Sequence, residues 1–191
     1  AEGPLEPPLR LRWRFPAREN PKPREDGFVG NPCISNGRLY IGNNNGLLYC
    51  LDARSGKRYW SFQCQSYVEC TPAARDNRIV FGSFDGNVYC LDAISGKLRW
   101  QFATGPRLPG TKGYNDVTRG VDSSPAIVGG QVYFGSWDGH LYCLDLDSGK
   151  LVWKQLLGGL VHRSGPAVDE THGRVYIGAT DGSLYCFEAQ T

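Results

Sequence analysis

The chain contains no methionine, no long apolar run and no excess of charge of either sign. Its formal net charge is +2, from 21 Lys and Arg against 19 Asp and Glu. A nucleic-acid-binding protein would carry a concentrated basic stripe, and here the basic residues are scattered, so that class is disfavoured. No apolar run reaches the ~18 residues of a membrane-spanning helix, and no signal peptide is recognisable. The missing methionine leads us to expect a mature or excised part of a longer protein.

Seven cysteines are present, but none of their spacings is that of a zinc site. Four of them take one position in a repeated segment: Cys50, Cys90, Cys143 and Cys186. We expect these four to be small buried residues in separate sheets, too far apart for disulfide bonds. Cys64 and Cys70 flank one short connection and are either a disulfide, in an oxidising compartment, or two free thiols. Cys33 has no partner left.

One segment recurs about four times, most clearly as QVYFGSWDGHLYCLDLDSGKLVW at residues 131–153. Each copy has an Asn-Gly or Asp-Gly pair and a YCLD-like stretch, and three copies continue into SGK and a tryptophan three residues later. Copies that recur every ~40 to 50 residues are typical of propellers and solenoids. A unit of about 40 residues cannot bury its own apolar faces, so we expect the units to share a stacked core.

Each complete unit predicts four short strands joined by tight turns, which fits the 25 Gly and 12 Pro. The second strand is a stretch such as QVYFG, Gln131–Gly135, and the third is a stretch such as LLYCLD, Leu47–Asp52. The third strand is apolar on both faces, as expected for a sheet that is covered on both sides. The Asn-Gly or Asp-Gly pair between these strands predicts a two-residue type I′ hairpin turn.

Three kinds of repeated residue are predicted to be architectural. The aspartate of YCLD can accept N–H bonds in the following turn, whose glycine supplies a backbone angle that other residues resist. The tryptophan has a large apolar area that suits packing between neighbouring sheets. These positions are Trp13, Trp60, Trp100 and Trp153, then Asp52, Asp92 and Asp145, and finally Gly56, Gly96 and Gly149.

The repeat SFDGNVYCLDAISGKLRW, residues 83–100, resembles the pyrroloquinoline-quinone (PQQ) repeat, the blade unit of quinoprotein-like β-propellers. The resemblance extends over residues 9–190. The pair Trp137-Asp138 suggests a WD repeat, but it occurs once, and the WD pattern does not predict a tryptophan after SGK. The resemblance implies an all-β propeller of four-stranded antiparallel blades, with about four blades in this chain and further blades if the parent is a seven- or eight-bladed ring.

The expected organisation is a proline-rich tail or linker at residues 1–8, followed by blades at about 30–62, 69–102, 122–156 and 164–190. Residues 9–15, LRLRWRF, alternate apolar and basic side chains and predict an orphan fourth strand. This strand could complete the last blade and remove its open edge. The chain is then part of a larger propeller, a small closed ring, or one of two halves that pair through open blade edges.

The resemblance implies three alternative functions. The first is a non-catalytic scaffold, similar to propeller lipoproteins of outer-membrane assembly or to appended sensor and adaptor domains. The second is a fragment of a PQQ- and Ca²⁺-dependent alcohol or sugar dehydrogenase, and the third is a ligand-binding domain appended to an enzyme. Such dehydrogenases often carry an adjacent cysteine pair, which is missing here, and Ca²⁺ needs six to eight oxygen ligands. We therefore expect a scaffold with no catalytic, cofactor or metal site.

Two insertions, at residues 16–27 and 103–121, are predicted to lie on the side of the propeller that carries the Asn-Gly and Asp-Gly hairpins. Mixed charge with Tyr and Arg suits recognition of a protein or peptide. The candidate partner-binding residues are Arg107, Lys112, Tyr114, Asn115, Asp116, Arg119, Asp122 and Arg163. His140, His162 and His172 have no partner at catalytic or ligand spacing in the sequence and are expected to be solvated. The family favours a bacterial envelope location, whereas the unpaired thiols favour a reducing compartment.

Overall fold

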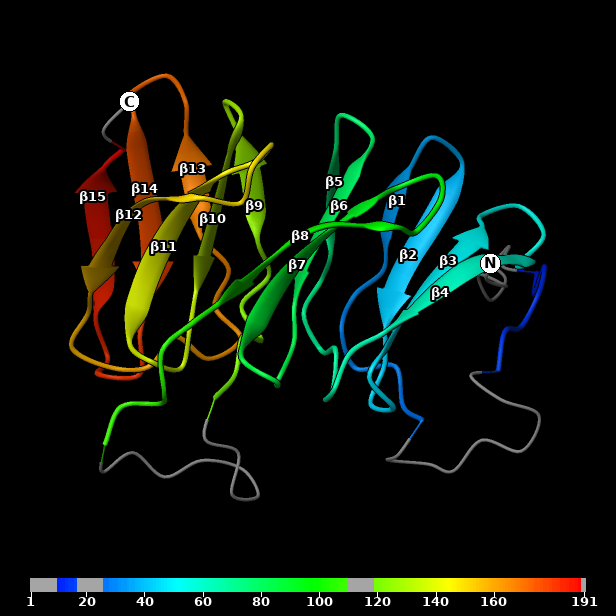
Figure 1. The fold of residues 1–191 in the computed structure, drawn as a ribbon, viewed down its shortest axis with the longest axis horizontal. Coiled ribbons are helices and arrows are strands. Elements are labelled where there is room, and N and C mark those ends of the chain that lie inside the picture. Colours follow the sequence, from blue (N-terminus) through cyan, green and yellow to red (C-terminus); the bar gives the residue numbers. More distant parts are fainter. Residues whose placement is uncertain (1–9, 17–25, 110–118, 190–191) are drawn as a thin grey trace, which may run out of the picture.

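The computed structural model describes residues 10–16, 26–109 and 119–189, in which every regular element is a β-strand. The strands form separate antiparallel sheets that lie side by side in an open row (Figure 1). Blade 1 consists of β1 (Cys33–Ser35), β2 (Arg38–Gly42), β3 (Leu47–Asp52) and β4 (Arg58–Gln63). Blade 2 consists of β5 (Ala73–Arg75), β6 (Arg78–Gly82), β7 (Asn87–Asp92) and β8 (Leu98–Ala103).

Blade 3 consists of β9 (Ala126–Val128), β10 (Gln131–Gly135), β11 (His140–Asp145) and β12 (Leu151–Leu156). Blade 4 has three strands in the described residues, β13 (Ala167–Asp169), β14 (Arg174–Gly178) and β15 (Leu184–Glu188). Each blade is a simple meander, and the first strands of consecutive blades contact one another in the order β1, β5, β9, β13. The predicted all-β class with antiparallel blades is confirmed. Because the described residues form no helix, none of them belongs to a helix that could cross a membrane.

The type I′ turns lie at a different hairpin from the one predicted. Both turn residues have positive φ between β1 and β2, where φ is 49° at Asn36 and 72° at Gly37. In the Asn-Gly loop between β2 and β3, positive φ is confined to Gly46. This loop is longer than a two-residue turn. Asn43 N–H donates to the carbonyl of Leu47 at 3.0 Å, and Gly46 N–H donates to the carbonyl of Asn43 at 3.2 Å. The glycine is therefore needed for the one residue of this loop that has positive φ.

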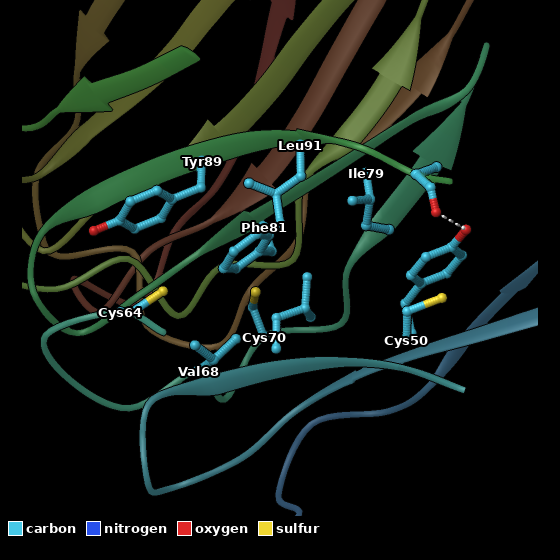
Figure 2. Close-up of a cluster of buried hydrophobic side chains, with 11 residues drawn as sticks. Cys50, Cys64, Val68, Cys70, Ile79, Phe81, Tyr89 and Leu91 are labelled. Carbon is cyan, nitrogen blue, oxygen red and sulfur yellow. Dashed lines mark hydrogen bonds between the residues drawn. The ribbon is translucent and has the colours of Figure 1, made fainter. Parts of the chain in front are cut away.

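Each third strand serves two interfaces, because alternate side chains point to opposite faces of the blade. We call the face turned to the following blade the back face, and the face turned to the preceding blade the front face. Leu48 and Cys50, on the back face of blade 1, pack in one buried cluster with Ile79, Phe81 and Leu91 from the front face of blade 2 (Figure 2). Equivalent positions build the interfaces between blades 2 and 3 and between blades 3 and 4. The core is therefore a series of inter-blade layers.

The tryptophans on the fourth strands of blades 1 and 2 each cover the corner of the next blade. A Cβ atom added at Gly149 would lie 2.5 Å from the Cδ2 atom of Trp100, so only glycine fits beneath the ring. Trp60 packs on Gly96 in the same way, and Trp13 packs on Gly56. The glycines also have positive φ, 68° at Gly149, which independently disfavours other residues.

The corner aspartates fix the turns that carry these glycines. Asp92 Oδ1 accepts the backbone N–H of Ser95 at 2.8 Å and its hydroxyl at 2.9 Å, and Asp52 does the same with Ser55. These bonds favour the ionised carboxylate, so the pKa of Asp92 falls to about 2, mainly through the Ser95 N–H. Asp145 makes equivalent bonds to Ser148, and its pKa is also lowered. The corners are therefore electrostatically stabilised turns.

All seven cysteines are free thiols, and three of the four repeat cysteines are buried as predicted. Cys50, Cys90 and Cys143 are fully buried, as predicted, and burial raises the thiol pKa of each. Cys64 and Cys70 are buried without a bond between them, so the structure has the free-thiol alternative. Cys186 contradicts the prediction of burial, because it is exposed. It lies on the back face of blade 4, where no following blade covers it.

The predicted strand at residues 9–15 is not present. Residue 9 lies outside the described part, and residues 10–16 form no strand. The last blade, which lacks a fourth strand in the described residues, lies at the opposite end of the row from the N-terminal segment (Figure 1). The predicted closure within one chain therefore does not occur in this structure. Residues 1–8, the predicted tail, also lie outside the described residues.

Candidate functional site

The loops between second and third strands and the connections between blades gather on one side of the molecule, which we call the hairpin face. Asn44 N–H donates to the carbonyl of Gly27 at 3.0 Å, which places the described end of the first insertion against the β2–β3 loop. On the second insertion, Trp137 N–H donates to the carbonyl of Gly120 at 3.0 Å, and Leu108 N–H donates to that of Trp137 at 3.2 Å. The described ends of both insertions therefore lie on the predicted side.

A buried carboxylate, Asp122, organises the centre of this face. Its side chain accepts the indole N–H of Trp137 at 2.9 Å and the backbone N–H of Arg163 at 3.2 Å, both at Oδ1. Its other oxygen, Oδ2, lies 2.6 Å from Nδ1 of His162. Asp122 is 3% exposed, so these partners replace the water that a surface carboxylate would have. The residue thereby joins the connections that lead into blades 3 and 4.

An ion pair extends the cluster to blade 2. The guanidinium Nη2 of Arg163 lies 3.4 Å from Oε2 of Glu69, in the connection that precedes β5. Burial raises the pKa of Glu69, and the Arg163 charge opposes that rise. Arg163 has φ 57°, a strained left-handed conformation for a side chain of this size. Blade 4 has one more residue than blade 3 between the buried valine and the following serine, and Arg163 takes up that extra residue.

Aromatic side chains pack against this group of charged residues. Trp137 is buried, and its ring contacts Phe84 edge-on at a centroid distance of 5.0 Å and His162 at 5.6 Å. Leu160 completes the small apolar cluster. The charged groups are thus held on a rigid aromatic base that is shared by blades 2, 3 and 4. We call Glu69, Asp122, Trp137, His162 and Arg163 the axial cluster.

The structure brings together part of the predicted partner-binding set. Asp122 and Arg163 meet directly, through the backbone of Arg163. Arg119 is exposed and packs its side chain over Gly86 of the β6–β7 hairpin, and Arg107 lies next to the Leu108 contact with Trp137. The remaining predicted residues, Lys112, Tyr114, Asn115 and Asp116, lie outside the described residues.

Sequence reasoning missed Glu69, His162 and Trp137. The prediction of a solvated His162 is wrong, because Asp122 lies within contact of its ring. One signal could have found the first two. Glu69, Asp122 and His162 each follow a buried valine, Val68, Val121 or Val161, just before the first strand of a blade. Residues at equivalent positions of a propeller converge near its axis, so their proximity was predictable from the repeat.

The axial cluster does not supply the ligands that the calcium ion of the PQQ-dependent dehydrogenases needs. Calcium needs six to eight oxygen ligands. Within residues 10–16, 26–109 and 119–189, no group of three or more His, Cys, Asp or Glu side chains is placed to hold a metal ion. Asp122 already accepts two N–H bonds and contacts His162. These contacts join the connections that precede blades 3 and 4.

A family model described as "Outer membrane protein assembly factor BamB" matches residues 10–191. Among curated proteins, the quinone-dependent alcohol dehydrogenase subunit of Gluconobacter oxydans is 31% identical over 145 residues, which are 76% of this chain and 13% of that protein. BamB of Moranella endobia is 29% identical over 134 residues, 69% of this chain and 34% of that protein. The chain thus spans about a third or less of these relatives. Among solved structures, BamB from Moraxella catarrhalis superposes with a TM-score of 0.69 at 25% identity, over 86% of this chain and 48% of that one.

Proposed function

Because the chain belongs to the PQQ-repeat propeller family of the assembly factor BamB, we propose that it is a non-catalytic scaffold that binds a protein partner through its hairpin face. The axial cluster carries this proposal. Its charged groups are engaged with one another on an aromatic base, and no nucleophile lies among them. Such an arrangement fixes loop positions and presents charge without supplying a reactive group. No cofactor takes part in this function.

The exposed cations of the hairpin face suit a partner segment that carries carboxylates. Arg119 and Arg163 are exposed, and the Arg163 guanidinium is only partly neutralised by Glu69 at 3.4 Å. Guanidinium groups can bind a carboxylate through two parallel N–H bonds, which gives direction as well as affinity. The backbone that holds Arg163 is fixed by Asp122, so binding does not need to order that backbone. A partner of the outer-membrane assembly type, within the bacterial envelope, fits the relative that shares this fold.

Site-specific photocrosslinking tests the proposed face. A photoreactive residue is placed at Arg119 or Arg163 on the hairpin face, and at Ile94, which is 59% exposed at the opposite end of the strands, as the matched control. We expect one defined protein adduct from bacterial envelope extract at the first two positions and none at Ile94. Deletion of residues 108–118 should abolish the adduct while the β-rich circular dichroism spectrum stays unchanged. Equal adducts at all three positions, or capture that survives the deletion, would contradict the proposal.

A second candidate is a fragment of a quinone-dependent alcohol dehydrogenase, favoured by the 31% identity to the Gluconobacter oxydans subunit. It predicts dye reduction with alcohols or glucose once PQQ and Ca²⁺ are added. Saturable turnover in that assay would replace the scaffold proposal. The third alternative, a ligand-binding domain appended to an enzyme, stays a prediction that depends on the rest of the parent chain.

A further inference from the structure

The chain contains two Asn-Gly pairs, and the fold places them in different environments. Asn36-Gly37 forms the turn between β1 and β2, and Asn45-Gly46 lies in the loop between β2 and β3. The two pairs therefore lie at opposite ends of blade 1 (Figure 1). An asparagine that precedes glycine can lose its side-chain amide without an enzyme, because glycine has no Cβ atom to shield the backbone nitrogen.

The reaction closes a ring between the asparagine side chain and the following backbone nitrogen. The glycine nitrogen loses its proton and bonds to Cγ of the asparagine, while the side-chain nitrogen takes up a proton and leaves as ammonia. Water then opens the resulting succinimide at either of its carbonyl groups, which gives aspartate or isoaspartate. The sum is a hydrolysis with no change of oxidation state. Hydrogen bonds that hold the side chain or the backbone nitrogen slow the ring closure, because they must open first.

The first pair leaves both reacting groups accessible. Asn36 and Gly37 are exposed, and a Cβ atom added at Gly37 would meet no atom within 4 Å. Within the described part of the chain, the hydrogen bond that ties this turn to another segment runs from the Ala53 N–H to the Gly37 carbonyl at 2.9 Å. That bond engages neither the Asn36 side chain nor the Gly37 nitrogen.

The exposure of this turn does not depend on what precedes blade 1. The turns at the same place in blades 2 and 3 are Asp76-Asn77 and Gly129-Gly130, and their residues are exposed as well. Both of these blades are packed against a neighbour on each side. An open β1–β2 turn is therefore a property of the blade.

The second pair is held at both reacting groups. The Asn45 side chain donates through Nδ2 to Oδ1 of Asp26 at 3.3 Å and accepts the Leu47 N–H at Oδ1 at 3.2 Å. The Gly46 N–H, whose nitrogen would attack, donates to the carbonyl of Asn43 at 3.2 Å. Gly46 is also buried, and a Cβ atom added there would lie 2.9 Å and 3.0 Å from carbonyl oxygens of the connection to blade 2.

We propose that Asn36 is a site of spontaneous succinimide formation and isoaspartate conversion, and that the β2–β3 loop protects Asn45 from the same reaction. Each hydrogen bond that must open slows ring closure by about twofold to tenfold. The bonds that hold Asn45 and Gly46 should therefore slow its conversion by more than about tenfold relative to Asn36. This modification is independent of partner binding, because the β1–β2 turn lies at the end of blade 1 away from the hairpin face (Figure 1).

Isoaspartate at position 36 would disturb the contact between blades 1 and 2. It carries the backbone through Cγ, and the added atom does not fit a tight turn in which Ser35 pairs with Arg38. The Arg38 guanidinium donates to the carbonyl of Ile94 in blade 2 at 3.5 Å and lies 4.2 Å from the ring centroid of Tyr59. A shift at the start of β2 would loosen these contacts, so converted chains should unfold at a lower urea concentration.

Peptide mapping by mass spectrometry after prolonged incubation at mildly alkaline pH tests this inference. Arg38 lies between the two pairs, so trypsin places each pair in its own peptide. The rates are measured in the folded protein and in the same protein unfolded in guanidinium chloride, which supplies the intrinsic reactivity of each pair. The ratio of the Asn36 rate to the Asn45 rate should be more than about tenfold higher in the folded protein.

Asn36→Gly is the matched variant, because it reproduces the Gly129-Gly130 turn of blade 3 and removes the reactive amide. Its urea midpoint should stay constant during incubation, whereas the wild-type protein should accumulate a less stable population. Equal rate ratios in the folded and unfolded protein would overturn the inference. An Asn36 that stays unconverted in the folded protein while the unfolded chain converts would also overturn it. An equal loss of stability in Asn36→Gly would contradict the effect assigned to isoaspartate.

Discussion

Replacing a tryptophan at a blade corner is the most informative perturbation of this fold, because two matched sites differ in one hydrogen bond. Trp60 and Trp100 cover equivalent glycines, Gly96 and Gly149. The indole N–H of Trp100 donates to the carbonyl of Leu146 at 2.8 Å, whereas the buried indole nitrogen of Trp60 has no hydrogen-bond partner. A side chain on β2 explains this difference. Tyr40 donates its hydroxyl to Ala93, the carbonyl that Trp60 would otherwise reach.

The structure therefore predicts two different losses of stability. Truncation of a buried tryptophan to alanine costs about 3 to 5 kcal/mol, and we expect Trp100→Ala to fall in that range. Trp60→Ala should cost about 1 kcal/mol less, because it breaks no indole hydrogen bond. Trp100→Phe and Trp60→Phe keep most of the packing and isolate that difference.

Urea unfolding followed by circular dichroism gives the free energy of unfolding of each variant. Equal losses for the two phenylalanine variants would refute the hydrogen-bond assignment. A loss below about 1 kcal/mol for Trp100→Ala would refute inter-blade packing of this residue altogether.

Three further predictions follow from the same contacts. Gly149→Ala should lower the free energy of unfolding by more than about 2 kcal/mol, because the residue has positive φ and its new Cβ atom would collide with Trp100. Gly130 has positive φ but open space around it, so Gly130→Ala should cost only about 1 kcal/mol. The urea midpoints of the two variants distinguish these losses. The pKa of Asp92 is about 2 in the folded chain, below its unfolded value, so its contribution to stability is present above pH ~4 and lost as the pH falls towards 2. Asp92→Asn should therefore flatten that part of a curve of unfolding free energy against pH. Arg163→Gly relieves a left-handed conformation, so it should leave the free energy of unfolding within about 1 kcal/mol of wild type. It should also reduce photocrosslinking from position 119, because the Arg163 guanidinium is lost. An unfolded variant or undiminished crosslinking would contradict the assigned role.

The sequence predicted the architecture because the repeat places the same residue types at equivalent positions of each unit. Trp60 and Trp100 recur at one offset from SGK, and a residue that recurs in every unit serves an interface between units. The turn type was mispredicted because an Asn-Gly pair favours positive φ at both residues, while the Asn43–Leu47 bonds impose a longer loop.

The end blades and the axial cluster were harder to predict for a different reason. Cys186 shares its sequence context with three buried cysteines, and its exposure follows from its place at the end of the row. The approach of His162 to Asp122 joins two connections that are distant in sequence, so it is predicted by their equivalent positions in the repeat and not by a short spacing along the chain. Such contacts follow from the stacking of blades, which brings equivalent positions together.

Strand-resolved amide hydrogen exchange tests the central claim most directly, namely that each blade is stabilised by the blades on either side of it. We predict slow exchange in β7 and β11, which are covered on both faces, and fast exchange in β15, whose back face is exposed and whose outer edge pairs with no strand in the described residues. Uniform protection across these strands, or exchange in β15 as slow as in β11, would contradict the account.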